Sequence, residues 1–152
     1  MTTLSERIQE ELVRAMRLQD RQKVSALRMI RAALQNREID KRAPLSDAEV
    51  IETLSSLVKK AKESIEQFRL GGRTDLVSKE EKELQIILSF LPRQMEEAEI
   101  REHIRSVIRE LGAEGPKDLG PVMKSAMVGL RGRADGKLVQ QLAREILASP
   151  RS

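Results

Sequence analysis

The sequence of 152 residues predicts an all-α protein in two parts, for three reasons. Apolar residues recur every three or four positions in each segment, which is the period of an amphipathic helix, and no segment alternates as a half-buried strand does. Gly and Pro interrupt this pattern, as they do at helix ends. The helical segments become shorter after Pro92. We therefore predict a four-helix unit over residues 1–92, followed by a compact three-helix domain over residues 93–152.

The first two helices are predicted from capping residues that precede apolar stripes. Thr3 and Glu6 have the spacing of a capping box, in which two side chains accept hydrogen bonds from backbone N–H groups at a helix start. Asp20 can cap the second helix, which should end before Pro44 because the residue preceding a proline avoids the helical region. The two stripes are Leu4, Ile8, Leu12, Ala15 and Met16, and then Val24, Leu27, Ile30 and Leu34.

The third helix has the clearest start and the longest apolar seam. Ser46 and Glu49 form a second capping box. Gly71–Gly72 should end this helix, because glycine takes the left-handed cap conformation at little cost. A heptad seam within the helix, residues 46–70, offers a face for a protein partner or a second copy. The seam comprises Ile51, Leu54, Val58, Ala61, Ile65 and Phe68.

The remaining helices are bounded by Gly, Pro and capping residues. Ser78 offers a start for the fourth helix, which ends at Leu91–Pro92. Asp118 is the predicted cap of the sixth helix, since Pro121 is tolerated only in a first turn. Asp135 should cap the seventh helix, and we expect the tail Ser149–Ser152 to fray. The four stripes are Leu84, Ile87, Leu88 and Leu91; Ile100, Ile104, Val107, Ile108 and Leu111; Leu119, Val122, Met123, Ala126, Met127 and Leu130; and Leu138, Val139, Leu142, Ile146 and Leu147.

Composition excludes several classes of chemistry. The chain has no Cys and one His, His103, so it offers neither thiol catalysis nor a site that needs two imidazoles. Glu80, Glu81 and Glu83 lie among lysines near a helix start, where acids favour the helix dipole. We therefore predict no catalytic residue, no metal and no cofactor. The first residues lack an apolar signal region and no run is long enough to span a bilayer, so the prediction is a cytoplasmic protein without membrane contact.

The net charge is +4 and the basic residues are unevenly distributed. Nine Lys/Arg lie between Arg14 and Arg42 against three acids, and six lie between Lys117 and Arg144 against two. Local basic excess suggests a polyanionic partner, although solvated helix faces explain it as well.

The loop before the last helix concentrates these charges. Its cations surround a helix N-terminus, whose free N–H groups and positive dipole end favour an anion. The two glycines either permit that approach or merely satisfy the geometry of a helix corner, and both interpretations stand. The residues in question are Arg131, Gly132, Arg133, Gly136 and Lys137.

Several dispersed motifs, in the right order along the whole chain, resemble the YqeY-like family. Asp118–Met123 and Gly132–Lys137 resemble its C-terminal signature, and Leu27–Ile30 resembles its second helix. Gly72–Leu76, Glu83 and Leu91–Gln94 resemble its middle. That family is similar to the C-terminal tail of GatB, a component of the tRNA-dependent Asp/Glu amidotransferase, and a related helical domain precedes the catalytic core of some glutaminyl-tRNA synthetases.

The resemblance implies a helical N-terminal domain, a three-helix tail-like domain and a role in translation. In the amidotransferase the tail helps to hold tRNA while chemistry occurs elsewhere. By analogy Lys124, Arg131, Arg133 and Lys137 would face RNA. A family label of carbon–nitrogen ligase with glutamine as amido donor looks inherited from the fusion partner, because this chain has no ATP-binding signature and no amidase nucleophile.

Three hypotheses follow for function. The first is a non-enzymatic accessory protein that binds tRNA, or a tRNA-handling enzyme on its tRNA, through residues 93–152. The second is a protein-interaction module or homo-oligomer that uses the heptad helix 46–70. The third, an amidotransferase-type enzyme, has the least support in the residues.

Overall fold

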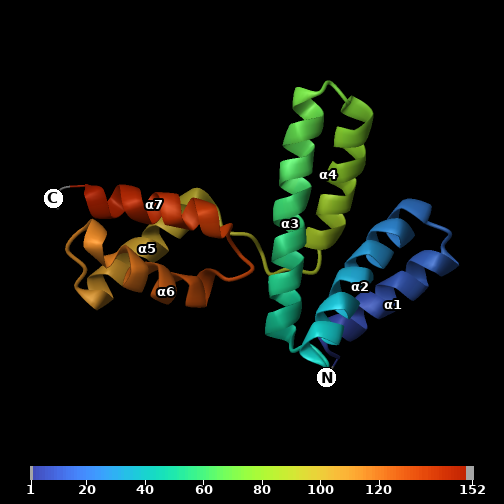
Figure 1. The fold of residues 1–152 in the computed structure, drawn as a ribbon, viewed down its shortest axis with the longest axis horizontal. Coiled ribbons are helices and arrows are strands. Elements are labelled where there is room, and N and C mark those ends of the chain that lie inside the picture. Colours follow the sequence, from blue (N-terminus) through green and yellow to red (C-terminus); the bar gives the residue numbers. More distant parts are fainter. Residues whose placement is uncertain (1, 150–152) are drawn as a thin grey trace. The chain divides into compact units, whose positions relative to one another are not determined.

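The computed structural model describes residues 2–149, and the regular secondary structure in that range is α-helical apart from one short 3-10 helix (Figure 1). The all-α prediction is therefore confirmed. The chain divides into two compact units, Met1–Pro92 and Arg93–Ser152. That each unit folds as an independent domain stays a prediction. Of the tail expected to fray, Ser149 is hydrogen-bonded to Glu145, and residues 150–152 lie outside the described residues.

The first unit consists of two helical hairpins. In Figure 1, α1 runs beside α2 and α3 runs beside α4. Their aliphatic stripes converge on one core, in which Ile8, Leu27 and Ile87 are almost completely buried. Met16, assigned to the first stripe, instead lies on the surface, half exposed. The bounds are α1 Leu4–Arg17, α2 Arg21–Lys41, α3 Asp47–Leu70 and α4 Thr74–Leu88.

The predicted caps of the first three helices are all present. The Thr3 hydroxyl accepts a hydrogen bond from the Glu6 N–H at 3.1 Å, and the Thr3 N–H donates to the Glu6 carboxylate. Ser46 forms the same reciprocal pair with Glu49. The Asp20 carboxylate accepts from the backbone of the third residue of α2 at 3.2 Å. Each cap joins residues three positions apart, so local sequence was enough to predict it.

The possible start of α4 at Ser78 is not the one that the structure adopts. The helix begins at Thr74 rather than near Ser78. Gly72 takes a positive φ of 71°, which turns the chain sharply after α3. Arg73 then makes two hydrogen bonds to the Asp75 carboxylate, at 3.2 and 3.1 Å. Asp75 also lies in the first turn, where its charge favours the helix dipole. This ion pair begins the helix without a Ser or Thr cap.

The second unit packs three helices and the 3-10 helix η1 around its own core. α6 contacts both α5 and α7, and α5 also contacts α7. Ile104, Leu130 and Val139 are fully buried at the centre. Asp135 caps α7 as predicted, accepting the Lys137 N–H at 3.1 Å. The bounds are α5 Glu97–Leu111, η1 Pro116–Asp118, α6 Leu119–Leu130 and α7 Gly136–Ala148.

Asp118 does not cap α6 with its side chain, which corrects the sequence prediction. Its carboxylate accepts the Glu114 N–H at 2.8 Å and the Gly115 N–H at 3.4 Å, and so closes the turn that precedes η1. Pro121 is the third residue of α6. A proline is tolerated there because the first N–H groups of a helix have no partner within the helix.

A charged pair defines the start of α5. Arg93 makes two hydrogen bonds to the Glu99 carboxylate, at 3.1 and 2.8 Å, and Glu99 also accepts the Glu96 N–H. The Arg93 hydrogen bonds, with the Glu96 bond adding to them, lower the pKa of Glu99 from 4.5 to about 2. Glu99 therefore stays ionised through most of the acidic range.

Close packing of α5 against α6 depends on one small residue. His103 on α5 lies with its Nε2 3.3 Å from the carbonyl oxygen of Ala126 on α6. A Cβ added at Gly129 would lie only 3.0 Å from Cε1 of the same ring. The imidazole is thus a packing and hydrogen-bonding group at this crossing, and glycine at position 129 makes room for it.

Limited proteolysis tests whether the two units are separable. We expect proteinase K to cut first at residues 89–96 or at 71–73, because these segments lie between helices. Mass spectrometry of the first fragments identifies the cut. A first cut within residues 51–68 of α3 would contradict the division after Pro92.

Substitution of Gly129 tests the α5–α6 crossing. We expect Gly129→Ala to lower the free energy of unfolding by about 1 kcal/mol, because the new methyl group overpacks against His103. Gly120→Ala is the matched control on the same helix: nothing lies within 4 Å of its new Cβ. It should be neutral or stabilise by up to about 1 kcal/mol. Urea unfolding measures the free energy of unfolding of both variants. If the His103 ring causes the loss, Gly129→Ala should no longer destabilise a protein that carries His103→Ala.

The pH dependence of stability tests the Arg93–Glu99 pair. A carboxyl group whose pKa is lower in the folded state stabilises that state above its unfolded pKa, near 4.5. This contribution disappears as the pH falls to about 2. We therefore expect Glu99→Gln to be less stable than wild type at pH 7 and to converge with it near pH 2 in urea unfolding curves. Glu110→Gln, an exposed α5 position, should differ little at any pH, and an equal loss there would rule out a specific pair.

Candidate nucleic-acid interface

The loop between α6 and α7 spans residues 131–135 and has a defined backbone conformation. Arg131 ends α6 in an extended conformation. Gly132 follows with a φ of 76° and is buried. Because side chains disfavour positive φ, glycine at this position lets the chain reverse toward α7. The backbone N–H groups of Arg133 and Ala134 both bond to the Leu130 carbonyl, which closes the turn.

The segment at the start of the second unit fixes this loop from the other side. The Met95 N–H donates to the Arg133 carbonyl at 2.9 Å. The Gln94 side-chain amide donates to the Gly132 carbonyl at 2.7 Å. The Arg133 Nε donates to the Arg93 carbonyl at 3.1 Å. Three hydrogen bonds thus join residues 93–95 to two successive loop residues.

These contacts give Arg133 a structural task. Its guanidinium is half-buried and bonded to backbone, and its positive charge contributes to the low pKa of Glu99. The sequence prediction grouped Arg133 with Arg131 and Lys137 as phosphate ligands. In the structure, at least one of its N–H groups instead donates to a backbone carbonyl of the same chain, that of Arg93.

The other predicted site residues lie on the surface, and two of them, Lys124 and Lys137, have no side-chain hydrogen bond to this cluster. Lys137 and Gly136 are exposed in the first turn of α7, and Lys124 is exposed on α6. Arg131 is exposed at the end of α6. Within residues 2–149, no hydrogen bond or ion pair links Lys124 to the loop. The structure therefore brings together Gly132 and Arg133, while the lysines remain separate surface groups.

Sequence reasoning missed Arg93 and Gln94 as parts of the site. Both were assigned to the joint between the two units, which is where they lie. Their partners are 38 and 40 positions further along the chain. The sequence offers one indication of their role, which is that two polar side chains directly follow Pro92. This pattern does not predict which residues they hydrogen-bond to.

Ion pairs in the second unit are concentrated on α5. Its arginines pair with acids, as in Arg101 with Glu97 and Glu145 at 2.9 and 3.0 Å. Residues 117–144 contain six Lys/Arg and two Asp. Four of these cations form no ion pair with any described residue, and all four are exposed to solvent. They are Lys117, Lys124, Lys137 and Arg144.

Three carboxylates on α4, Glu80, Glu81 and Glu83, were the alternative candidates for chemistry. Glu83 is buried, with 8% of its surface exposed. Burial, together with the neighbouring Glu83 charge, raises the pKa of Glu80. Within residues 2–149 no group of three or more His, Asp or Glu residues is arranged so that it could hold a metal ion. No helix in that range combines the length and apolar character needed to cross a membrane.

Comparison with curated proteins identifies fungal relatives. The chain is 29% identical over 147 residues to "Altered inheritance of mitochondria protein 41, mitochondrial" of Pyrenophora tritici-repentis, covering 94% of this chain and 80% of that protein. Proteins of the same name from Lachancea thermotolerans and Eremothecium gossypii are 31% and 36% identical. Those matches cover 72% and 55% of this chain, but only 60% and 46% of the relatives' own lengths.

The names of these relatives contradict the cytoplasmic location predicted from the sequence. That prediction inferred the compartment from the composition of the residues around the first helix. The structure gives those residues another explanation, since Thr3 and Glu6 cap α1 and Leu4 is buried in the core. Their composition is thus set by folding and does not specify a compartment.

The curated names describe no chemistry, whereas a family model covers nearly the entire sequence. The model described as "Yqey-like protein" matches residues 5–147. This range includes all seven α-helices apart from single residues at the two ends. The chain therefore belongs to the Yqey-like protein family.

Proposed function

We propose that this chain is a non-catalytic accessory protein that binds tRNA, or a tRNA-handling enzyme on its tRNA, through residues 93–152. The observation that carries the proposal is the set of cations between residues 117 and 144 that lack ion pairs with described residues. Acids neutralise the arginines of α5, so the unpaired cations among the described residues of the second unit lie mainly on η1, α6 and α7. A polyanion supplies the missing partner, and counterion release favours its binding.

The chemistry of the second unit favours contact with the phosphate backbone. Both phenylalanines, Phe68 and Phe90, belong to the first unit, and the chain has no Tyr or Trp. Residues 93–152 therefore offer none of these rings for base stacking, which is the usual way of recognising unpaired RNA bases. Phosphate contacts position a protein on RNA without reading its sequence. The expected mode is recognition of shape and charge.

Individual residues receive different roles in this proposal. Lys137 lies at the N-terminus of α7, where the positive end of the helix dipole adds to its own charge. Lys124 extends the basic surface along α6. Arg133 positions the loop through its bond to the Arg93 carbonyl. The only imidazole, that of His103, contacts a backbone carbonyl and lies beside no nucleophile among its hydrogen-bond partners, which supports a non-catalytic role.

The heptad seam of α3 provides less support for a partner than its sequence suggests. Leu54, Val58, Ala61 and Ile65 are buried in the core of the first unit. They contact this chain's own helices, and α4 lies along α3. Most of the apolar face that could have joined a second copy is thus covered, and Ile51 and Phe68 are partly buried.

Removal of two lysines tests the proposal. We expect Lys124→Ala with Lys137→Ala to weaken binding of unfractionated tRNA by about tenfold at moderate salt, equally for different tRNA species. The slope of log affinity against log salt should become shallower by about 1.4 to 1.8, because each phosphate contact contributes roughly 0.7 to 0.9. Fluorescence anisotropy with labelled tRNA measures both quantities.

The matched control removes two exposed lysines from α3, by Lys59→Ala with Lys60→Ala. It changes net charge equally and should retain affinity and slope. Arg133→Ala should mainly lower stability, because it removes the bond to the Arg93 carbonyl. Unchanged affinity and slope in a correctly folded Lys124/Lys137 variant would refute the proposed interface.

A further inference from the structure

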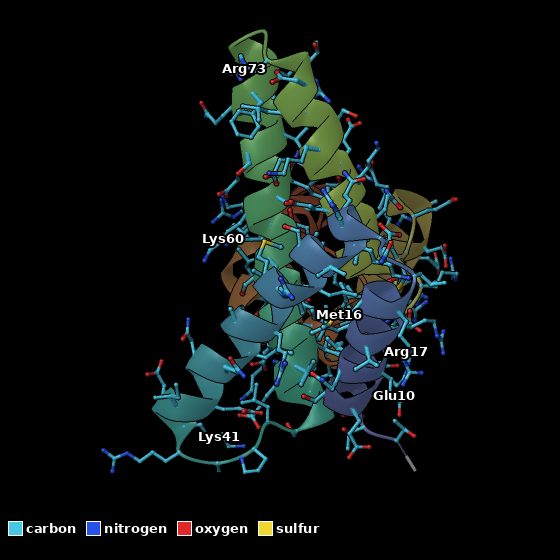
Figure 2. The ribbon with its side chains drawn as sticks, turned by 90° about the vertical axis from the view of Figure 1, so that its right-hand side faces the viewer. Glu10, Met16, Arg17, Lys41, Lys60 and Arg73 are labelled. Atoms are coloured by element: carbon cyan, nitrogen blue, oxygen red, sulfur yellow. The ribbon has the colours of Figure 1, made fainter. Side chains whose placement is uncertain are left out.

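A groove in the first unit lies at the corner where α1 turns into α2. It has a volume of about 640 Å³ and is open to solvent. Met16, on the last turn of α1 (Figure 2), and Val24, on the first turn of α2, supply its apolar surface. Arg21 and Arg28 border it on α2. None of these residues takes part in the interface proposed for residues 93–152.

Met16, which lines this groove, and two residues close to it in sequence have exposed apolar side chains. Met16 is 49% exposed and Leu18, directly after α1, is 73% exposed. Val13, one turn earlier on α1, is 37% exposed. A single exposed apolar residue needs no explanation, but several beside a concave surface are typical of a binding site. Methionine adapts its shape readily to a bound side chain.

The corner that presents Leu18 is conformationally fixed. Gln19 takes a φ of 56°, which non-glycine residues adopt infrequently. Hydrogen bonds hold it there, from the Gln19 N–H to the Met16 carbonyl and from the Asp20 N–H to the Ala15 carbonyl. The exposed apolar residues thus belong to an ordered turn, and little conformational entropy would be lost there on binding.

The cations around the groove have no acidic partner among the described residues. Arg17, Arg21 and Arg28 are exposed and form no ion pair within residues 2–149. Two acids close to them in sequence, Glu11 and Asp20, are already engaged. Glu11 pairs with Arg14 and Lys23, and the Asp20 carboxylate caps α2. Arg21 and Arg28 therefore border the groove without a paired carboxylate among the described residues.

We propose that this groove binds an acidic amphipathic segment of a partner protein. An apolar side chain of that segment enters between Met16 and Val24, and carboxylates on either side pair with Arg21 and Arg28. These arginines are seven residues apart on one helix, about 10 Å at 1.5 Å per residue. Two carboxylates two helical turns apart on the partner match that span.

The shape and composition of the groove favour a peptide over the other polyanions. A lipid surface is locally flat and fits a convex contact better than a groove of this volume. A nucleic acid would leave Met16 and Leu18 without apolar partners, whereas arginine and methionine beside a pocket are enriched at protein interfaces. An acidic amphipathic helix satisfies both the charge and the apolar surface.

Peptide selection on the full chain tests the proposal. A random library of about 15-residue peptides, four helical turns, is depleted on an Arg21→Glu/Arg28→Glu variant and then selected on wild type. We expect the recovered peptides to combine Asp or Glu with apolar residues at helical spacing. In fluorescence anisotropy, the charge reversal should weaken a recovered peptide at least tenfold. The same peptide with Lys in place of its acids should bind the reversed variant.

The control reverses two charges elsewhere, by Lys59→Glu with Lys60→Glu on α3, and should leave peptide affinity unchanged. Circular dichroism verifies that each variant keeps its helix content. Recovered peptides without acidic residues, or binding that survives the arginine reversal, would overturn the proposal. Arginine-dependent binding of phosphatidylserine-containing vesicles or of tRNA, without selection of acidic peptides, would also overturn it. Because Lys124 and Lys137 are intact in these variants, failure here is distinguishable from failure of the proposed RNA interface.

Discussion

Burial of one aliphatic stripe per helix is the constraint on which the structure depends. The chain has two Phe and neither Trp nor Tyr, so Leu, Ile, Val and Ala must fill both cores. Ile30, Leu54 and Ile104 are completely buried, and burying such a side chain stabilises a fold by about 1.5–3 kcal/mol. Thr53 and Glu83 are the buried polar residues among those described. Nearly all charged groups consequently remain on the surface, where they are available for binding.

Hydrogen bonds between segments distant in sequence determine the conformation of the α6–α7 loop, which burial of apolar side chains does not. The aliphatic stripes position α6 and α7 but do not dictate the shape of the loop between them. That shape comes from Gly132, which permits the turn, and from Gln94 and Met95, which bind the loop backbone. Arg133 completes the arrangement through the Arg93 carbonyl. A basic residue in a candidate phosphate loop therefore also supports the fold, which makes its substitution a poor test of binding by itself.

Ion pairing differs from one surface of the molecule to another. On α5, acids and arginines neutralise one another. On α6–α7 and at the α1–α2 corner, cations remain unpaired with described residues. The two surfaces differ in their surroundings. Lys124 and Lys137 are charges exposed on helices, whereas Arg21 and Arg28 border an apolar groove, where their planar guanidinium groups can pair with peptide carboxylates.

The sequence by itself determined the helical class and most helix starts, because periodicity and caps act within a few residues. Thr3 and Ser46 find their partners three positions away, so their role can be inferred without a fold. Tertiary structure decided where alternatives compete. The Asp118 carboxylate could either cap α6 or close the preceding turn. In the folded chain it closes the turn, because it accepts the backbone N–H of Glu114. Arg133 binds a carbonyl 40 residues away, a pairing that exists only once packing has brought the two segments together.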